Sequence, residues 1–166
     1  MYRRLAFVVA LVVVAADVAS KALAVHFLEG RAPIKLLGDF LKLSFARNPG
    51  AAFSFGTGST LVFTILALGV SGGVVVTLGK VHNLQWSVAL GGVLGGALGN
   101  VLDRLFRTPG FLQGHVVDFI EFPHYPLFNL ADSAIVCSGI AIAWLSLRGI
   151  PFGADDASQD PRVETS

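Results

Sequence analysis

The sequence predicts an all-α membrane protein, a bundle of four transmembrane helices with a small extracytoplasmic β-rich cradle formed by the two outer loops. Hydrophobic residues make up 54% of the 166 residues and charged residues only 14%, whereas a soluble domain carries about a quarter charged residues. Four apolar stretches approach the length of about 20 residues that a membrane-spanning helix needs. Between them, "LKLSFAR" alternates apolar and polar residues, which is typical of a strand, and "VVDFIEF" reads as a second short strand.

The four spans are expected at residues about 5–27, 60–78, 86–106 and 129–147, within one membrane domain of residues 1–150. The first stretch also has the basic start, apolar run and small residues of a secretory signal peptide. Three further spans and the lack of a large polar domain favour a first helix that stays in the mature protein. Residues 151–166 are polar, so we expect a disordered cytoplasmic tail.

Four spans put both termini on the same side of the membrane, and lysine and arginine are distributed almost evenly between the two sides. Arg3 and Arg4 directly precede the first span and favour cytoplasmic termini. The segments 28–59 and 107–128 then face outward. They contain the two candidate strands, "LKLSFAR" at 41–47 and "VVDFIEF" at 116–122.

Several classes of function are disfavoured by the composition. A formal net charge of +1 provides no basic surface for nucleic acid. Cys137 is the single cysteine, so no internal disulfide can form. The histidines are scattered and have no metal-ligand spacing with cysteine or carboxylate residues. We therefore expect neither a metal nor a cofactor.

Asp17 and Lys21 are ionisable residues inside the first apolar span. An ionisable side chain at the centre of a bilayer costs at least about 2.5 kcal/mol, so each one requires a reason. The acid precedes the base by four residues on one helix face, which is the favourable order for an ion pair. We interpret the two as a structural polar pair whose loss should reduce stability more than catalysis.

Asn100, Asp103 and Arg104 share one face of the third span. Two rows of small residues lead to this polar turn. One row is Gly91, Gly95 and Gly99, and the row beside it is Gly92, Gly96 and Asn100. Such rows allow helices to pack closely, so this span should be central in the bundle. The polar turn has two interpretations: a substrate contact, or a buried Asp103–Arg104 ion pair that fixes the helix registry.

Asp118 and Asp132 are two carboxylates expected on the outer side. Asp118 lies in a candidate strand, and Asp132 is at the N3 position of a helix that Asn129 can cap. Two facing aspartates can share a proton, so that one activates water and the other protonates the scissile carbonyl. This is peptide hydrolysis by general acid–base catalysis. The spacing permits the two residues to meet but does not require it.

At these residues the chain resembles the lipoprotein signal peptidases of bacteria, also called signal peptidase II. Five segments carry the resemblance, in the family's order: "DVASK" (17–21), "RNPGAAFSF" (47–55), "GGALGNVLDR" (95–104), "VVDF" (116–119) and "FNLADSAI" (128–135). One such segment alone would mean little. Five in order on a chain with four spans are specific.

The resemblance implies an intramembrane aspartic endopeptidase. It would cut diacylglyceryl-modified prolipoproteins just before the lipidated cysteine, with Asp118 and Asp132 as the catalytic pair. Further polar residues match family positions around this pair and the bound peptide: Asn48, Asn100, Arg104 and Asn129. The implied partners are prolipoprotein, membrane lipid and the inhibitor globomycin. We expect a monomer in the bacterial inner membrane, with its site on the extracytoplasmic side.

Two other functions fit the sequence less well. A small membrane transporter or proton relay would use acids such as Asp17, Asp103 and Asp132 at successive depths in the membrane. A non-enzymatic assembly subunit would use its polar residues only to join helices, and it would not need Asp118 on an outer strand. The predicted clustering of the acids towards the outer side favours the peptidase.

Overall fold

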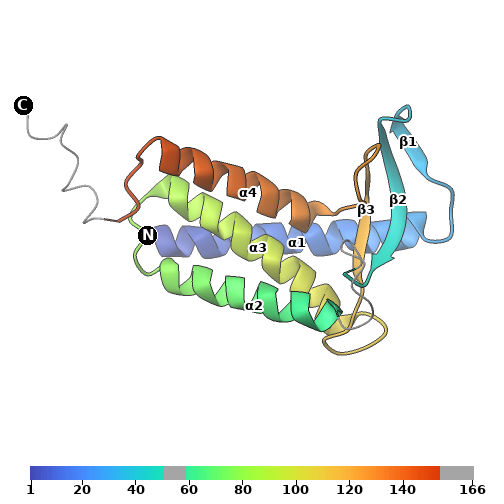
Figure 1. Ribbon diagram of the computed structural model, residues 1–166, viewed down its shortest axis with the longest axis horizontal. Helices are drawn as coiled ribbons and strands as arrows, with labels where there is room; N and C mark the ends of the chain where they lie inside the picture. Colours follow the sequence, from blue (N-terminus) through green and yellow to red (C-terminus); the bar gives the residue numbers. More distant parts are fainter. Residues whose placement is uncertain (51–58, 154–166) are drawn as a thin grey trace, which may run out of the picture.

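The computed structural model describes residues 1–50 and 59–153. Its elements in chain order are α1 (Tyr2–Leu28), β1 (Ile34–Leu37), β2 (Leu41–Asn48), α2 (Ser59–Thr77), α3 (Leu84–Phe106), β3 (Val116–Glu121) and α4 (Leu130–Leu147). The helices run side by side, and the strands form a sheet at one end of the bundle (Figure 1). The N-terminus and the end of α4 lie at the opposite end.

Within the described residues, four helices are long and apolar enough to cross a membrane. They agree with the four predicted spans, although α1 extends beyond 5–27 at both ends and α3 begins before residue 86. The class "all-α" is too narrow, because the outer segments form a three-stranded sheet. Strands β2 and β3 agree, to within one residue at their ends, with the two candidate strands at 41–47 and 116–122. Strand β1 was not predicted, because its sequence "IKLL" does not alternate apolar and polar residues. In the structure all four of its residues are exposed.

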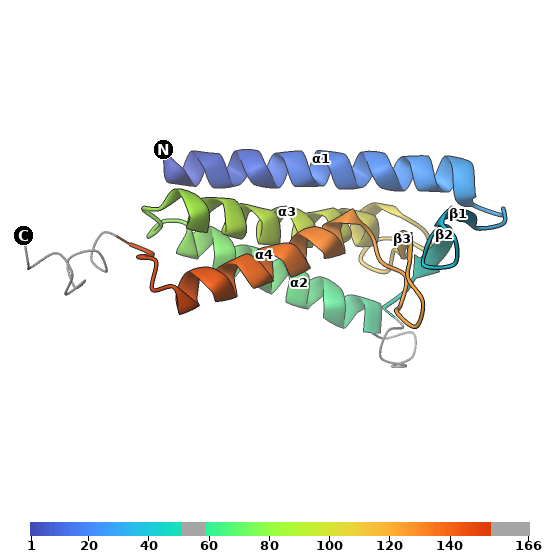
Figure 2. The same ribbon diagram turned by 90° about the horizontal axis from the view of Figure 1, so that it is seen from above.

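Helix α3 is the centre of the bundle and packs against each of the other three helices (Figure 2). In the most apolar stretch of α3, 67% of the residues are buried, compared with 22% of those in α1, 22% in α2 and 11% in α4. The outward sides of these three helices carry exposed apolar side chains such as Leu11, Ile65 and Ile140. This is the surface expected of helices surrounded by lipid.

The two glycine rows of α3 face two different helices. A Cβ atom on Gly95 would lie 2.7 Å from the Ala10 carbonyl oxygen of α1, and one on Gly96 would lie 2.5 Å from the Ala131 carbonyl oxygen of α4. Both separations are too short for a real side chain. The prediction that these small residues allow close helix packing around a central span is therefore confirmed.

The sheet has the order β1-β2-β3 with antiparallel neighbours. Val117, fully buried, packs with Ala24 and Leu28 at the C-terminal end of α1. In the β2–β3 register Arg47 is opposite Val117, and Asn48 is opposite Val116. The end of β2 is consequently held beside the start of β3, close to Asp118.

Beyond α4 the chain turns back onto the start of α3. The Trp86 indole N–H donates to the Ile150 carbonyl at 3.0 Å, and the Phe152 ring meets the Trp86 ring edge-on at 5.1 Å between centroids. The first residues of the predicted disordered tail thus pack on the bundle. The remainder of that tail lies outside the described residues.

Candidate active site

The candidate site lies where β3, α3 and α4 meet at the end of the bundle that carries the sheet. Asp118 comes from β3 and Asp132 from the first turn of α4. Asn129 connects the two: its side-chain amide donates to Asp118 Oδ1 at 2.7 Å, and its backbone N–H donates to Asp132 Oδ2 at 3.2 Å. Both carboxylates therefore belong to one hydrogen-bonded network.

Local sequence explains the position of Asp132. Asn129 caps α4, and its Oδ1 accepts from the backbone N–H of Asp132 at 3.0 Å. Asp132 in return accepts from the Asn129 backbone, which completes a capping box. The predicted helix start, with Asn129 as N-cap and Asp132 at N3, is confirmed. A carboxylate at this position is stabilised by the positive end of the helix dipole.

Asp118 is nearly inaccessible, with 2% of its surface exposed. Its Oδ2 accepts from the Asn48 side-chain amide at 2.8 Å, while Asn129 occupies Oδ1. Burial raises the pKa of the Asp118 carboxyl to about 6, because a desolvated carboxylate is unfavourable. The two amide donors oppose this rise, and the nearby Asp132 charge adds to it.

Asn100 joins α3 to the same network. Its Nδ2 donates to Asp132 Oδ1 at 2.7 Å, and its Oδ1 accepts from Asn129 at 3.2 Å. Each of the four carboxylate oxygens of the two aspartates thus accepts from an amide N–H. Of the polar residues singled out from the sequence, three asparagines surround the aspartates: Asn48, Asn100 and Asn129.

Lys21 lies beneath this network and is fully buried. Its ammonium is 2.7 Å from Asp17 Oδ2, as expected for the polar pair. It is also 3.1 Å from Asp103 Oδ2 and donates to Asn100 Oδ1 at 2.9 Å. The spacing alone suggested an isolated ion pair between Asp17 and Lys21. In the structure, Lys21 also connects α1 to the polar turn of α3.

The interpretation of Asp103 and Arg104 as an ion pair is wrong. Asp103 instead pairs with Lys21 and with Arg107, and it accepts from the backbone N–H of Val117 at 3.1 Å. Arg104 lies four residues from Asn100, and one of its terminal nitrogens donates to the Asn100 carbonyl at 3.2 Å. Within the described part of the chain, its buried Nε has no hydrogen-bond partner.

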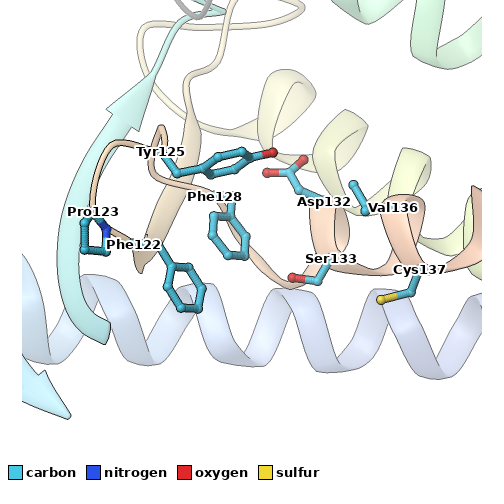
Figure 3. Close-up of a pocket in the computed structure, with 8 residues that line it drawn as sticks. All are labelled: Phe122, Pro123, Tyr125, Phe128, Asp132, Ser133, Val136 and Cys137. Atoms are coloured by element: carbon cyan, nitrogen blue, oxygen red, sulfur yellow. The ribbon is translucent and has the colours of Figure 1, made fainter. Parts of the chain in front are cut away.

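An apolar groove of about 520 Å³ opens beside Asp132 (Figure 3). Aromatic residues between β3 and α4 form one wall, and the Tyr125 ring extends toward Asp132. The wall is Phe122, Tyr125 and Phe128. Sequence reasoning missed this groove, although the aromatic run "FPHYPLF" at 122–128 was a possible signal.

A second apolar groove, of about 260 Å³, lies between α2, α3 and α4. Asn100 and Arg104 are its polar lining residues, among apolar ones such as Phe63 and Ile135. Asn100, which lines this groove, donates to Asp132, which lines the first groove. Across residues 1–50 and 59–153, no group of three or more His, Cys, Asp or Glu residues could hold a metal ion.

The chain is similar over most of its length to known proteins. The sequence profile of the family described as signal peptidase (SPase) II matches residues 9–148. The lipoprotein signal peptidase of Streptomyces coelicolor is 51% identical over 144 residues, which cover 87% of this chain and 71% of that protein. The lipoprotein signal peptidase of Rhodococcus jostii is 50% identical over 148 residues, covering 89% and 75%.

The fold is also shared with a solved structure described as a bacterial membrane enzyme. It aligns with a TM-score of 0.76 at 27% identity, over 94% of this chain and 92% of that chain. A second bacterial membrane enzyme structure aligns with the same TM-score, 0.76, at 30% identity over 86% and 92%. The chain therefore belongs to the signal peptidase II family and is an aspartic endopeptidase, and its described residues include four helices able to span a membrane.

Proposed function

We propose that this enzyme removes the signal peptide from diacylglyceryl-modified prolipoproteins by cutting just before the lipidated cysteine, with Asp118 and Asp132 as its catalytic pair. The observation that carries the proposal is the position of these two residues. They come from different elements, share Asn129, and lie beside apolar grooves at one end of a membrane bundle. The relatives named lipoprotein signal peptidase support the substrate class.

The two carboxyl groups have different surroundings, which suggests different roles. Asp118 holds a proton up to about pH 6 because it is buried, so it is the general acid. Asp132 accepts from Asn100 and Asn129 and lines the apolar groove, where water and substrate can reach it, so we assign it the role of general base. Asp132 takes a proton from water, the hydroxide attacks the scissile carbonyl carbon, and Asp118 protonates the carbonyl oxygen. The tetrahedral intermediate then collapses and its C–N bond breaks, as Asp132 gives its proton to the leaving nitrogen and Asp118 takes a proton back from a hydroxyl group.

The substrate must bring a peptide backbone into a place with little water. Its carbonyl groups then need donors, since an unsatisfied backbone group in such surroundings costs several kcal/mol, on the order of 2–7. Arg104 and Asn100 lie at the polar end of the groove between α2, α3 and α4 and can supply donors there. The apolar walls of the two grooves, one lined by Asp132 and the other by Asn100 and Arg104, suit a lipid-bearing substrate that arrives from the bilayer.

We place the enzyme as a monomer in the bacterial cytoplasmic membrane, with cytoplasmic termini and an extracytoplasmic site. Globomycin is its expected inhibitor. The transporter alternative would need Asp17 and Asp103 to exchange protons, yet both are held by the Lys21 ammonium. This arrangement suits fixed charges better than a proton relay.

Substituting each aspartate by asparagine tests the proposal. Asp118→Asn and Asp132→Asn remove one ionisable group each without changing side-chain volume, so cleavage of a purified diacylglyceryl precursor in detergent should fall by about 1000-fold or more. Asp39→Asn is the control, because that carboxylate is 74% exposed in the β1–β2 turn and should not be needed. Near-normal turnover by a folded Asp118 or Asp132 variant would refute the catalytic pair.

A further inference from the structure

We infer that Lys21 is a positioning residue for the catalytic pair and not only one half of a structural ion pair. The inference rests on the proposed roles of Asp118 and Asp132. An ammonium has three N–H groups, and Lys21 has three oxygen partners, on Asp17, Asp103 and Asn100. Each of these partners leads to one of the elements that carry the two aspartates.

The first branch runs through Asn100 to Asp132. Oxygen Oδ1 of Asn100 accepts from Lys21 at 2.9 Å and from Asn129 at 3.2 Å, so its nitrogen must face Asp132. Turning this amide over would place its NH₂ group against the Lys21 ammonium, donor against donor. Lys21 therefore keeps Asn100 oriented as a donor to the proposed base.

The second branch runs through Asp103 to the strand that carries Asp118. Oxygen Oδ2 of Asp103 is 3.1 Å from Lys21 Nζ and also accepts from the backbone N–H of Val117 at 3.1 Å. Val117 directly precedes Asp118 in β3 and is fully buried. The charge of Lys21 thus holds the carboxylate that ties β3 to α3.

The third branch runs through Asp17 to the helix that carries Asp132. Asp17 Oδ1 accepts from the backbone N–H of Ala131 at 2.9 Å, in the first turn of α4. Gly99 allows this approach, since a Cβ atom there would lie 2.6 Å from Asp17 Oδ2. One buried ammonium consequently sets the relative position of β3, α3 and α4 at the site.

Removing Lys21 alone would leave Asp17 uncompensated, so the test uses a charge-balanced pair, Asp17→Asn with Lys21→Gln. A positioning role predicts that kcat falls about ten-fold or more while KM changes less than about three-fold, because chemistry and not binding is disturbed. Leu94→Ala is the stability control: it opens a cavity in the core of α3 away from the site and should lower Tm without changing kcat of the folded enzyme.

A second variant keeps the test decisive if the double variant does not fold. Asp103→Asn is nearly isosteric and leaves Lys21 paired with Asp17. It removes the negative charge that Lys21 holds, and its NH₂ group must face either Arg107 or Lys21 and Val117, donor against donor, so kcat should again fall with KM nearly unchanged. In addition, the double substitution should cost less activity in an Asn100→Ala background than in the wild type, since one branch is already broken.

The outcomes separate this inference from the proposed function. Folded variants of Lys21 and Asp103 with kcat within two-fold of wild type would overturn the positioning role, and so would equal losses with and without Asn100. If Asp118→Asn and Asp132→Asn are inactive in the same assay, only the Lys21 inference fails. If they remain active, the catalytic pair itself is wrong.

Discussion

Asn129 shows how much of this site depends on single side chains. Its Oδ1 caps α4 by accepting from Asp132, while its Nδ2 donates to Asp118 and to Asn100. An amide can do this because it carries both an acceptor and two donors. Aspartate at the same position would cap the helix equally well but would face Asp118 with a second negative charge. The helix cap and the support of the proposed acid therefore need the same residue type.

The raised pKa of Asp118 predicts a pH dependence of catalysis. If Asp118 must be protonated to act as the acid, kcat/KM should decline tenfold per pH unit above about pH 6. The hydrogen bond from Asn48 lowers this pKa, so Asn48→Leu should move the decline to higher pH. Steady-state kinetics from pH 5 to 9 measure both. A decline that does not move in the Asn48 variant would argue against Asp118 as the titrating group.

The same shift has a consequence for stability. The folded protein binds the Asp118 proton more tightly than the unfolded chain, whose pKa is near 3.8. The stabilisation is complete below about pH 4 and is lost as the pH rises through about 6, by at most about 3 kcal/mol. The Asp118→Asn variant cannot ionise at this position and does not lose this stabilisation as the pH rises. The Tm of the variant should therefore rise relative to the Tm of the wild type between pH 5 and 7.5.

Arg104 should be sensitive to replacement by lysine. It lines the groove between α2, α3 and α4, so its guanidinium can donate to a substrate carbonyl there. Lysine keeps the charge but lacks the planar fork of donors. Arg104→Lys should fold normally and lose about ten-fold or more in kcat/KM, which corresponds to one charge-assisted hydrogen bond of about 1.5–3 kcal/mol. Arg148→Lys, at the opposite end of the bundle, serves as the control, and wild-type activity of Arg104→Lys would reject the contact.

Helix α3 is the element on which the others are assembled. Its glycine rows bring it against the backbones of α1 and α4, and its last two turns carry Asn100, Asp103 and Arg104. Close packing fixes the axial position of α1 relative to α3, and with it the distance from Lys21 to Asn100. A polar residue inside a membrane bundle can reach a partner on another helix only if the two backbones are this close.

Replacing glycine by alanine should therefore affect stability differently at a helix contact and on the outward side of a helix. On Gly95 the added methyl group would meet the Ala10 oxygen at 2.7 Å, whereas on Gly139 of α4 it would meet nothing within 4 Å. Gly95→Ala should lose about 1–3 kcal/mol of stability through overpacking, and Gly139→Ala should be neutral or slightly stabilising. Melting of both variants in the same detergent makes the comparison. Equal stability would mean that α1 and α3 are not held at this distance.

The whole molecule is asymmetric along the bundle axis. The sheet is at one end and the short connection between α2 and α3 is at the other (Figure 1). Asp118 lies in β3 and Asp132 in the first turn of α4, beside the aromatic groove, so both aspartates are at the sheet end. Arg3 and Arg4 lie at the end opposite the sheet. If basic residues stay in the cytoplasm, the catalytic end faces outward. A substrate is then cut after its lipid-bearing part has reached the outer leaflet.

This orientation can be tested with single cysteines in a Cys137→Ser background. Asp39→Cys, in the exposed β1–β2 turn, should react with a membrane-impermeant maleimide in intact cells. Lys80→Cys, in the exposed connection between α2 and α3, should react only after the cells are permeabilised. The reverse labelling pattern would place the active site in the cytoplasm and contradict the proposed topology.

Local patterns were sufficient to predict several parts of this protein. The lengths of the apolar stretches predicted the four helices, because crossing a bilayer requires about 20 apolar residues wherever they occur. The glycine spacing predicted a central third helix, and Asn129 with Asp132 predicted the start of the fourth. The acid–base spacing of Asp17 and Lys21 likewise predicted their ion pair. Each of these features depends on residues within one or a few helical turns.

Only the tertiary structure decided which distant residues meet. Lys21 and Asn100 are 79 residues apart, and their contact depends on how closely the glycines allow α1 to approach α3. The same packing decides that Asp103 pairs with Lys21 and Arg107 instead of Arg104. Strand β1 forms because β2 offers it an edge, not because its own residues alternate. These features arise from contacts between elements, where packing geometry rather than local periodicity selects the partner.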